Sequence, residues 1–272
     1  MNTEMEIKKA ANILANAKRT VASCGAGISA ESGIATFRDP GGVWEKLNPA
    51  EVGTAGGLLS TLTRNPHKLI PFFIELLETF QKAEPNPAHL ALGELERMGI
   101  LQTVVTQNID NLHIEAGSRS VIEVHGNGFR TRCISCGGTE RLERKRIIKD
   151  TLKKVRKMQE FTIEAIASLL PPCRNCLSPT RPDVVMFGET VKDIPEAFEA
   201  ARRCDVLLAI GTSGTVYPAA YLPFQAKETG AKVIVVNPNE NAFSEVSDVY
   251  IPMKAGAAMG EIIKYIRKLT AL

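Results

Sequence analysis

The chain has 272 residues, of which 44% are hydrophobic and 23% are charged, and its formal net charge is +3. A chain of this size and composition can bury a substantial core, so we expect one large globular domain or one domain with a small module. The small net charge gives no support for nucleic-acid binding by itself.

The N-terminal residues show no targeting pattern. They carry early glutamates and lack an apolar core, so they do not resemble a secretory signal. No apolar run approaches the length of a membrane span. We therefore expect a cytoplasmic protein without membrane contact, in which the six cysteines remain reduced thiols.

A glycine-rich turn follows the first predicted strand. Apolar residues at helical spacing over 5–18 predict an opening helix, and a strand at 20–24 then runs into the sequence GAGISA. This sequence fits the G-x-G-x-x-[GA] fingerprint, in which glycines let the backbone approach a pyrophosphate and free amides at the next helix attract its charge. Because glycines are common in turns, an ordinary turn is an equally good interpretation of the motif alone.

The residues after this turn differ from those of a dehydrogenase. A dehydrogenase continues into a regular helix and a second strand that ends in an acidic residue about twenty positions on, whereas three glycines and a proline interrupt residues 31–44. We therefore expect at most one helical turn and then an extended loop. In that loop Arg38 could pair with a phosphate or carboxylate, and Phe37 could exclude water from a reactive centre, although core packing is the commoner role of an aromatic residue.

Residues 50–84 predict a small helical insertion, because they are loosely amphipathic and are broken by glycines and Pro66. A helix at 88–98 follows. His89 shares the apolar face of this helix, so we expect it to be packed in the core, whereas His67 should lie at the surface.

Residues 106–128 collect the polar groups on which the functional prediction depends. Gln107, Asn108 and Asp110 follow an apolar strand at 100–105, where α/β folds collect ligand groups. His125 follows a second short strand. A neutral imidazole facing amides and a carboxylate could act as a general base near pH 7. A pair of ordinary polar turns is the alternative.

Two C-x-x-C pairs predict a metal site. Four thiolates presented in pairs from tight turns give zinc its tetrahedral shell, and closed four-cysteine sites are structural. A redox dithiol is the alternative for one pair, but the presence of two pairs favours zinc. The pairs are Cys133 with Cys136 and Cys173 with Cys176.

The segment between the cysteine pairs is longer than in a usual zinc ribbon. It includes a basic run at 141–157, which we interpret as the solvated face of a helix, with a protein or chromatin contact as the alternative. Cys24 and Cys204 lie in apolar strand contexts and should be buried and inert.

The C-terminal third alternates strands and helices. The strand at 205–210 ends in Gly211-Thr212-Ser213, a turn that could hold a phosphate or ribose, and the strand at 232–236 ends in Asn237-Pro238-Asn239, whose amides could read ribose hydroxyls or an adenine edge. The alternation predicts an α/β fold, a doubly wound parallel sheet with a dinucleotide across its carboxyl edge. The other elements expected are a strand within 181–189 and helices at 194–203, 219–229 and 259–269.

Together these motifs resemble the sirtuin (Sir2-like) family of NAD-dependent protein deacylases. GAGIS, ESGI, ATFRD, TQNIDNLH, HGN, RPDVVMFGE, GTS and VNPN occur with the two cysteine pairs in the family's own order. The resemblance implies a doubly wound parallel Rossmann-like sheet with a smaller zinc-binding plus helical domain. The expected parts are the Rossmann domain at 1–39, 85–129 and 183–272, the cofactor loop and helical insertion at 40–84, and the zinc-binding module at 130–182.

The resemblance also implies residue roles. His125 and Asn108 would be catalytic, with His125 as the general base, and Asp110 would bind the nicotinamide carboxamide. Phe37 would shield the anomeric carbon. NAD would contact Gly25, Ala26, Gly27, Ser29, Glu31, Thr36, Phe37, Arg38, Gln107, Asn108, Ile109, Asp110, Gly211, Thr212, Ser213, Asn237, Pro238, Asn239 and Ala255. The substrate peptide would bind as an added strand against Val185, Met186, Phe187, Gly188 and Glu189. Cys133, Cys136, Cys173 and Cys176 would hold one structural zinc ion.

The implied reaction consumes NAD and removes an acyl group from protein lysine, producing nicotinamide, free lysine and 2′-O-acyl-ADP-ribose. Members of the family that prefer acidic acyl groups resemble one another in a Tyr-x-x-Arg pair, where this chain has Phe73 and Leu76. We therefore expect a neutral acyl group, with acetyl first, because a buried carboxylate without a cation is costly.

The alternatives are transfer of ADP-ribose from NAD to a protein, and a catalytically silent NAD-sensing or chromatin-binding module. For partners, we expect a protein that bears acetyl-lysine, with a chromatin protein as a candidate, and no direct contact with nucleic acid or membrane. We expect the protein to be a monomer.

Overall fold

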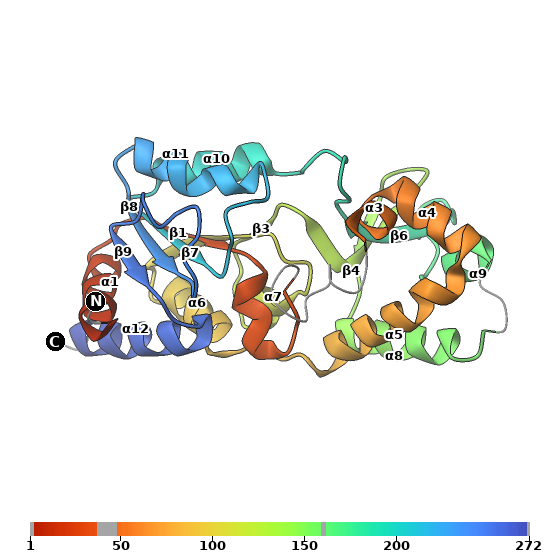
Figure 1. Cartoon of the computed structure of the whole chain (residues 1–272), viewed down its shortest axis with the longest axis horizontal. Coiled ribbons are helices and arrows are strands. Elements are labelled where there is room, and N and C mark those ends of the chain that lie inside the picture. Colours follow the sequence, from red (N-terminus) through yellow and green to blue (C-terminus); the bar gives the residue numbers. More distant parts are fainter. Residues whose placement is uncertain (1–2, 37–47, 159–161, 271–272) are drawn as a thin grey trace.

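The computed structural model describes residues 3–36, 48–158 and 162–270. Its larger part is built on a six-stranded parallel sheet with the strand order β3-β2-β1-β7-β8-β9 (Figure 1). The chain leaves β1 toward one edge and later returns beside it to fill the other edge, as in a doubly wound fold, so the predicted fold class is confirmed. The strands are β1 (Thr20–Cys24), β2 (Leu101–Thr106), β3 (Val121–Glu123), β7 (Val206–Ile210), β8 (Lys232–Val236) and β9 (Val249–Ile251).

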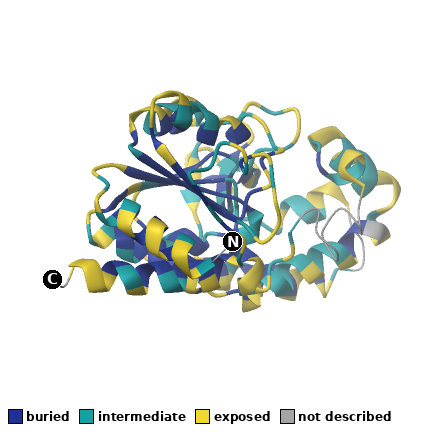
Figure 2. Ribbon diagram, turned by 60° about the vertical axis from the view of Figure 1, so that its left-hand side comes forward, coloured by how far each residue is buried: buried dark blue, intermediate teal, exposed yellow. Residues whose placement is uncertain are grey.

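Helices cover both faces of this sheet. On one face, α1 (Thr3–Ala15) and α6 (Pro87–Arg97) pack against α12 (Ala255–Thr270), and on the other face α10 (Ile194–Arg203) packs against α11 (Leu222–Glu228) (Figure 1). The strands between these two layers are almost wholly buried (Figure 2).

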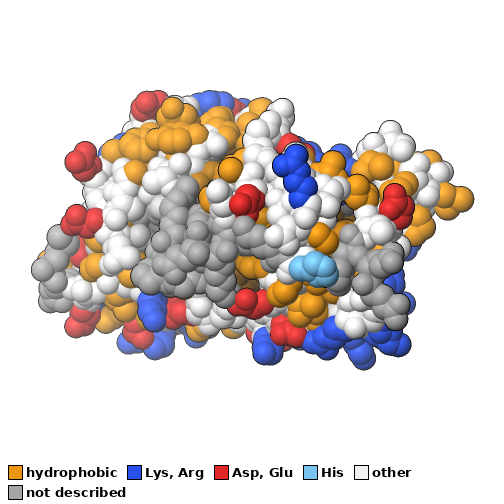
Figure 3. Space-filling view, turned by 45° about the vertical axis from the view of Figure 1, so that its right-hand side comes forward, with side chains coloured by type: hydrophobic (Ala, Val, Ile, Leu, Met, Phe, Trp, Pro, Cys, Tyr) orange, Lys and Arg blue, Asp and Glu red, His pale blue; other side chains and the backbone are white. Residues whose placement is uncertain are grey.

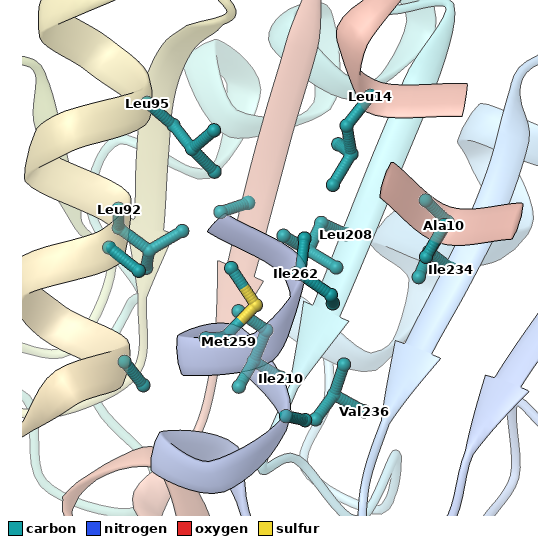
Figure 4. Packing of buried hydrophobic residues seen from close by; sticks show 14 of the residues in the cluster. Ala10, Leu14, Leu92, Leu95, Leu208, Ile210, Ile234, Val236, Met259 and Ile262 are labelled. Carbon is teal, nitrogen blue, oxygen red and sulfur yellow. The ribbon is translucent and has the colours of Figure 1, made fainter. Parts of the chain in front are cut away.

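Alternate residues of one strand contribute to two separate cores. Leu208 and Ile210 of β7 join the core beneath α1, α6 and α12 (Figure 4), whereas Leu207 and Ala209 join the core beneath α10 and α11. Side chains alternate across a strand, so a strand covered on both faces must be apolar throughout. The central strands were predictable for this reason.

Two helices differ from their predicted bounds. The helix predicted at 219–229 is divided into a 3-10 turn, η2 (Ala219–Tyr221), and α11, because Pro223 lacks a backbone N–H and is tolerated only in the first turn of a new helix. The closing helix begins at Ala255, four residues before the predicted start. Among the described residues, no helix is both long and apolar enough to cross a bilayer.

The smaller part contains a three-stranded antiparallel sheet in the order β5-β4-β6. Its strands are β4 (Gly126–Cys133), β5 (Thr139–Arg141) and β6 (Thr180–Val184). Ion pairs hold this sheet together: the buried carboxylate of Asp183 contacts Arg130 and Arg132 at 2.6 Å each, and Arg130 also contacts Glu123 at 2.5 Å. Of these strands, only β6 was predicted in part, by the strand expected within 181–189; β4 and β5 were not, because charged residues interrupt their apolar pattern.

Helices form the rest of the smaller part. The predicted insertion consists of α3 (Pro49–Val52), α4 (Ala55–Arg64) and α5 (Pro66–Lys82), and α8 (Arg144–Val155) packs against α5. Phe80 of α5 also meets Phe129 of β4 edge to face, with ring centroids 5.6 Å apart. Two short helices complete the part of the chain that is described, α7 (Leu112–Glu115) and α9 (Ile163–Ala167).

The predicted solvated face of the basic run is correct only in part. Arg144 is 2% exposed, and its guanidinium donates to both carboxylate oxygens of Glu115 and to the carbonyl oxygens of Phe80 and Ala83. A buried guanidinium requires such partners, because an unpaired charge would be costly to desolvate. Arg144 therefore anchors α8 to the rest of the molecule.

Candidate functional site

The turn after β1 is a 3-10 helix, η1 (Ala26–Ser32). The prediction of at most one helical turn was wrong, because seven residues of 3-10 helix make about two turns. The helix ends at Gly33, which adopts the left-handed conformation with φ of 85° and donates its N–H to the Ala30 carbonyl. A glycine is the favoured residue for this ending.

The glycines of the fingerprint pack against the turn that follows β7. A Cβ atom added to Gly25 would lie 2.8 Å from the carbonyl oxygen of Gly211, and one added to Gly27 would lie 2.8 Å from the Gly211 Cα atom. The Gly27 N–H donates to the Gly211 carbonyl over 2.8 Å. The glycines were predicted to let a pyrophosphate approach. In the structure, glycines are needed at these positions because a side chain would clash in the contact between the two turns. The Gly27 amide already donates to Gly211, so it is not free to bind a phosphate.

Backbone hydrogen bonds continue past the strand ends into the turns that carry the candidate residues. Each of these amides donates to the last residue of a neighbouring strand, at distances of 3.0 to 3.2 Å. The turns are therefore extensions of the sheet. The pairs are Gly25 to Ile210, Gln107 to Cys24, Gly211 to Val236 and Asn237 to Ile251.

Ser29 joins the turn after β1 to the turn after β2. Its hydroxyl donates to the Asp110 carboxylate over 2.6 Å and accepts from the Asn108 side-chain amide over 3.1 Å. The same amide group donates to the Gly25 carbonyl. Both protons of the Asn108 amide are thus used, and no described residue donates to its oxygen, which remains an acceptor for a ligand hydroxyl.

His89 orders this network from α6. Its Nδ1 accepts from the backbone N–H of Asn86 in a capping box, so the neutral ring carries its proton on Nε2, which lies 3.4 Å from the Ser29 hydroxyl. Burial lowers the pKa of His89 to about 4, so the ring is neutral at pH 7. The core position predicted for His89 is confirmed, and its link to Ser29 was not predicted.

Asp110 is buried, with 4% exposure. One carboxylate oxygen accepts from Ser29 and the other accepts from the backbone N–H of Leu112. Burial raises the pKa of Asp110, and these two hydrogen bonds act in the opposite direction. A buried carboxylate held in this way is oriented by its neighbours before any ligand arrives.

His125 lies between β3 and β4, beside the turn after β2. Its Nδ1 is 3.1 Å from the Gln107 carbonyl oxygen. A carbonyl only accepts, so Nδ1 carries the proton of the neutral ring and Nε2 has a free lone pair. Burial lowers the pKa of His125 from 6.5, and the hydrogen bond to Gln107 raises it to a smaller extent. The ring is therefore in its basic form at neutral pH, as a general base requires.

The turn after β7 contacts the same cluster. Gln107 donates its side-chain amide to the Thr212 hydroxyl over 3.1 Å, and Asn241 donates to the Thr212 carbonyl over 2.9 Å. Ser213 is exposed beside this contact. Asn241 was not predicted, because its position after the VNPN motif does not reveal a contact with residue 212.

The polar turn after β8 lies at the neighbouring strand end. Asn237 donates to the Asn239 carbonyl over 2.6 Å and accepts from the Tyr250 hydroxyl over 2.9 Å. Pro238 and Asn239 are exposed. The prediction placed these residues after β8, and the structure brings them to the same sheet edge as residues 211–213.

Two of the predicted NAD-contacting residues, Glu31 and Ala255, lie at the N-terminus of α12. The carboxylate of Glu31 accepts from the Gly256 backbone N–H over 2.5 Å. The favourable interaction of an anion with a helix N-terminus accounts for this contact. The Ala255 side chain is buried, so only its backbone could meet a ligand.

The segment after β6 is a turn. Residues 185–189 were predicted within a strand, but β6 ends at Val184. The Val185 N–H donates to the His125 carbonyl and the Phe187 N–H donates to the Gly53 carbonyl. The Glu189 carboxylate accepts from the Met186 N–H, and Gly188 has φ of 87°. This left-handed residue and the local carboxylate bond turn the chain away from the sheet.

The four cysteines come together as predicted. Their Sγ atoms lie within 4.8 Å of one another, with 3.5 Å between Cys133 and Cys176 and 3.6 Å between Cys136 and Cys173. Four sulfurs about 2.3 Å from one ion would be separated by about 3.8 Å. Backbone amides of Ser135, Cys136 and Asn175 point at these sulfurs, which suits thiolate ligands. The donor set fits a closed structural zinc site.

The remaining candidate residues add little to the geometry of the site. Thr36 is half-buried, and the carbonyl of Ile109 accepts from Gly128 N–H over 2.9 Å. Phe37 and Arg38 lie outside the described residues. Cys24 and Cys204 are buried as predicted, and burial raises the pKa of Cys204 to about 12, so both remain thiols at pH 7.

The chain is similar to known proteins in sequence and in fold. A model of the Sir2 family matches residues 25–218. An NAD-dependent protein deacylase of Desulfosudis oleivorans is 55% identical over 99% of this chain and 98% of its own length. A solved Sir2 homolog–NAD complex has a TM-score of 0.78 at 36% identity, covering 96% of this chain and 94% of that one. The structure of Sir2Af2 bound to a myristoylated histone peptide has a TM-score of 0.72 at 37% identity, covering 98% and 99%.

Proposed function

The chain belongs to the Sir2 family and is an NAD-dependent protein deacylase, and from this premise we propose which residues carry the reaction and which acyl group they accept. The observation that carries the proposal is the convergence of His125, Asn108, Asp110 and Ser29 where the turns after β1 and β2 meet. Each side chain is held in one protonation state or orientation by a neighbour on the sheet.

We assign the general base to His125. In the reaction of this family, bound NAD supplies an anomeric carbon that accepts the acyl oxygen as nicotinamide departs. His125 Nε2 has a free lone pair because Nδ1 donates to Gln107, so it can accept a proton from a ribose hydroxyl. The lowered pKa keeps the ring unprotonated at neutral pH.

Asn108 and Asp110 would orient the cofactor. The Asn108 amide donates to Gly25 and Ser29, which turns its oxygen outward as an acceptor for a ribose hydroxyl or a water. Asp110 is buried and held by Ser29 and Leu112, so its oxygens are oriented to meet an amide donor in a dry site. Gln107 and Thr212 would bridge this half of the site to the adenosine half.

The substrate peptide would lie against residues 185–189. Phe187 is 49% exposed, and its segment is hydrogen-bonded to His125 on one side and to Gly53 on the other. A peptide that runs beside this segment would bring its modified lysine close to the base. Backbone pairing would give affinity with little demand on sequence.

The acyl group would be neutral. Phe73 and Leu76 are half-buried on α5, at the positions where the family's acid-selective members have Tyr and Arg. Neither side chain can supply a cation to offset the desolvation of an acidic acyl chain. The binding of a myristoylated peptide by the related Sir2Af2 supports a neutral, apolar acyl group. Acetyl remains our first choice, and desuccinylation faster than deacetylation would contradict it.

The four cysteines would hold one zinc ion, whose role is structural because no ligand position is left open. We also propose that the protein acts as a monomer in the cytoplasm. The six free cysteines support a reducing compartment, and a protein that bears acyl-lysine, with chromatin proteins among the candidates, would be its partner.

The test is an assay of an acetyl-lysine peptide with NAD, comparing wild-type protein with His125→Ala. We expect equal amounts of nicotinamide and deacetylated peptide from the wild type, and a loss of about 10²–10⁴-fold in kcat for the variant, the usual contribution of a positioned base. Full activity in His125→Ala would reassign this histidine to a structural role. With labelled NAD, label recovered on protein would indicate ADP-ribosyl transfer instead of deacylation.

A further inference from the structure

Positive charge is concentrated in one short segment of the chain. Residues 141–157 contain nine Lys or Arg residues and two acidic residues, a net charge of +7, whereas the whole chain carries +3. The rest of the chain therefore has a net charge of −4. The overall charge hides this asymmetry, which the deacylase site does not use.

The apolar side of α8 is already occupied. Ile148, Leu152 and Val155 are buried, and α8 packs along α5. Arg144, also buried, ties the first turn of α8 to Glu115 and to backbone carbonyls. The helix is therefore fixed, and only its charged side faces outward.

Four cations form a row on that outward side, which we call the cationic stripe: Arg146, Lys149, Lys153 and Lys157. All four are exposed. Arg146, Lys149 and Lys153 follow one side of α8 along about 10 Å, and Lys157 lies two residues beyond the end of the helix. In Figure 3, Lys and Arg side chains gather along the lower edge of the molecule. Figure 1 shows that α8 lies at this edge.

The stripe keeps most of its charge. Lys145 and Arg156, at the side of the stripe, pair with Glu84 and Glu78 at 2.5 Å each. Within the stripe, Arg146 lies 3.9 Å from Asp150 with both side chains more than half exposed, and no described residue forms an ion pair with Lys149 or Lys153. Such exposed contacts neutralise little.

We propose that the cationic stripe binds the phosphodiester backbone of nucleic acid without reading its sequence. A duplex offers one negative charge per about 1.7 Å of its axis, so a row of this length faces several phosphates. No large apolar side chain is exposed on α8, whereas protein interfaces depend on aromatic and apolar anchors and are depleted of Lys. The buried apolar side also prevents α8 from inserting into a bilayer as amphipathic membrane helices do.

The test measures binding of fluorescein-labelled 20-base-pair DNA and RNA duplexes by anisotropy at 50 to 200 mM salt. Four phosphate contacts predict that log K falls with log salt with a slope of about −3 to −4. The double variant Lys149→Glu/Lys153→Glu should weaken binding more than tenfold and reduce the slope by about two. A difference between the two duplexes would show which nucleic acid supplies the phosphates.

The matched control is Lys264→Glu/Lys268→Glu on α12, which changes the net charge by the same amount and should bind as the wild type does. The wild type and both double variants should deacylate a short peptide at the same rate. A failed prediction of nucleic-acid binding can therefore be distinguished from a failed assignment of the deacylase residues. Absence of binding at 50 mM salt, or equal loss in both double variants, overturns the proposal. Tighter binding to polyglutamate or to phosphatidylserine vesicles than to either duplex also overturns it and assigns the stripe to that partner.

Discussion

Single neighbouring atoms determine where the protons lie on two histidines. The Asn86 N–H forces the proton of His89 onto Nε2, and the Gln107 carbonyl forces the proton of His125 onto Nδ1. His89 can therefore donate toward Ser29, and His125 can accept from a substrate. The two rings have opposite roles although burial lowers the pKa of both.

The proposed role of His125 as general base predicts the pH dependence of catalysis. The base acts only when unprotonated, so kcat/KM should rise with pH as His125 loses its proton. Because burial lowers its pKa from 6.5, the midpoint of this acidic limb should lie below pH 6.5. A pH profile with an acetyl-lysine peptide measures it. A midpoint above 6.5 would contradict the neutral, buried ring described above.

The contact between two turns predicts a stability effect at Gly27. In Gly27→Ala the new Cβ would meet the Gly211 backbone at 2.8 Å, and overpacking of this kind costs about 1–3 kcal/mol. The melting temperature should fall by roughly 2–4 °C for each kcal/mol lost. Gly56→Ala is the control, because a Cβ there would meet nothing within 4 Å. Equal melting temperatures for the two variants would refute the packing argument.

At the scale of elements, two strands connect the cysteine cluster to the candidate site. β4 runs from Gly126, next to His125, to Cys133, and β6 pairs with it before the chain turns at Val185 to bond His125. The antiparallel sheet is small and owes much of its order to ion pairs and to the cysteine cluster. The metal is therefore expected to stabilise the loop that carries the base.

Loss of one cysteine ligand should disturb both ends of the small sheet, the cysteine cluster at one end and the segment at His125 at the other. In Cys176→Ser we expect bound zinc to fall from one per chain to less than a tenth and deacylation to fall with it, because metal binding free energy is folding free energy in such modules. Zinc is measured by a colorimetric chelator. Ser135→Ala, an exposed change within the other cysteine turn, should retain both. Full activity in zinc-free protein would separate the module from catalysis.

At the scale of the whole molecule, the sequence predicts individual strands and turns but misses contacts between residues that are far apart in the chain. The strand β7 and the last four residues of β8 read as continuous apolar runs because they are covered on both faces, and the polar turns after them were therefore placed at one edge. The contact of Gly27 with Gly211 joins residues far apart in the chain, and no local pattern encodes it. The strands β4 and β5 of the small sheet were missed because their pairing partners, rather than apolar alternation, stabilise them.

Because backbone hydrogen bonds continue past the strand ends, the turns after the strands should resist local unfolding. Surface loops normally exchange their amide hydrogens quickly, but the amides of Gly25, Gln107 and Gly211 donate to strand residues and should exchange with the slow rates of the central strands. Hydrogen–deuterium exchange with mass spectrometry measures this in the free enzyme. Exchange as fast as at the exposed residues 239–240 would contradict it. If the expectation holds, these turns open only when the sheet itself does, so a ligand that binds there would meet a surface that is already formed.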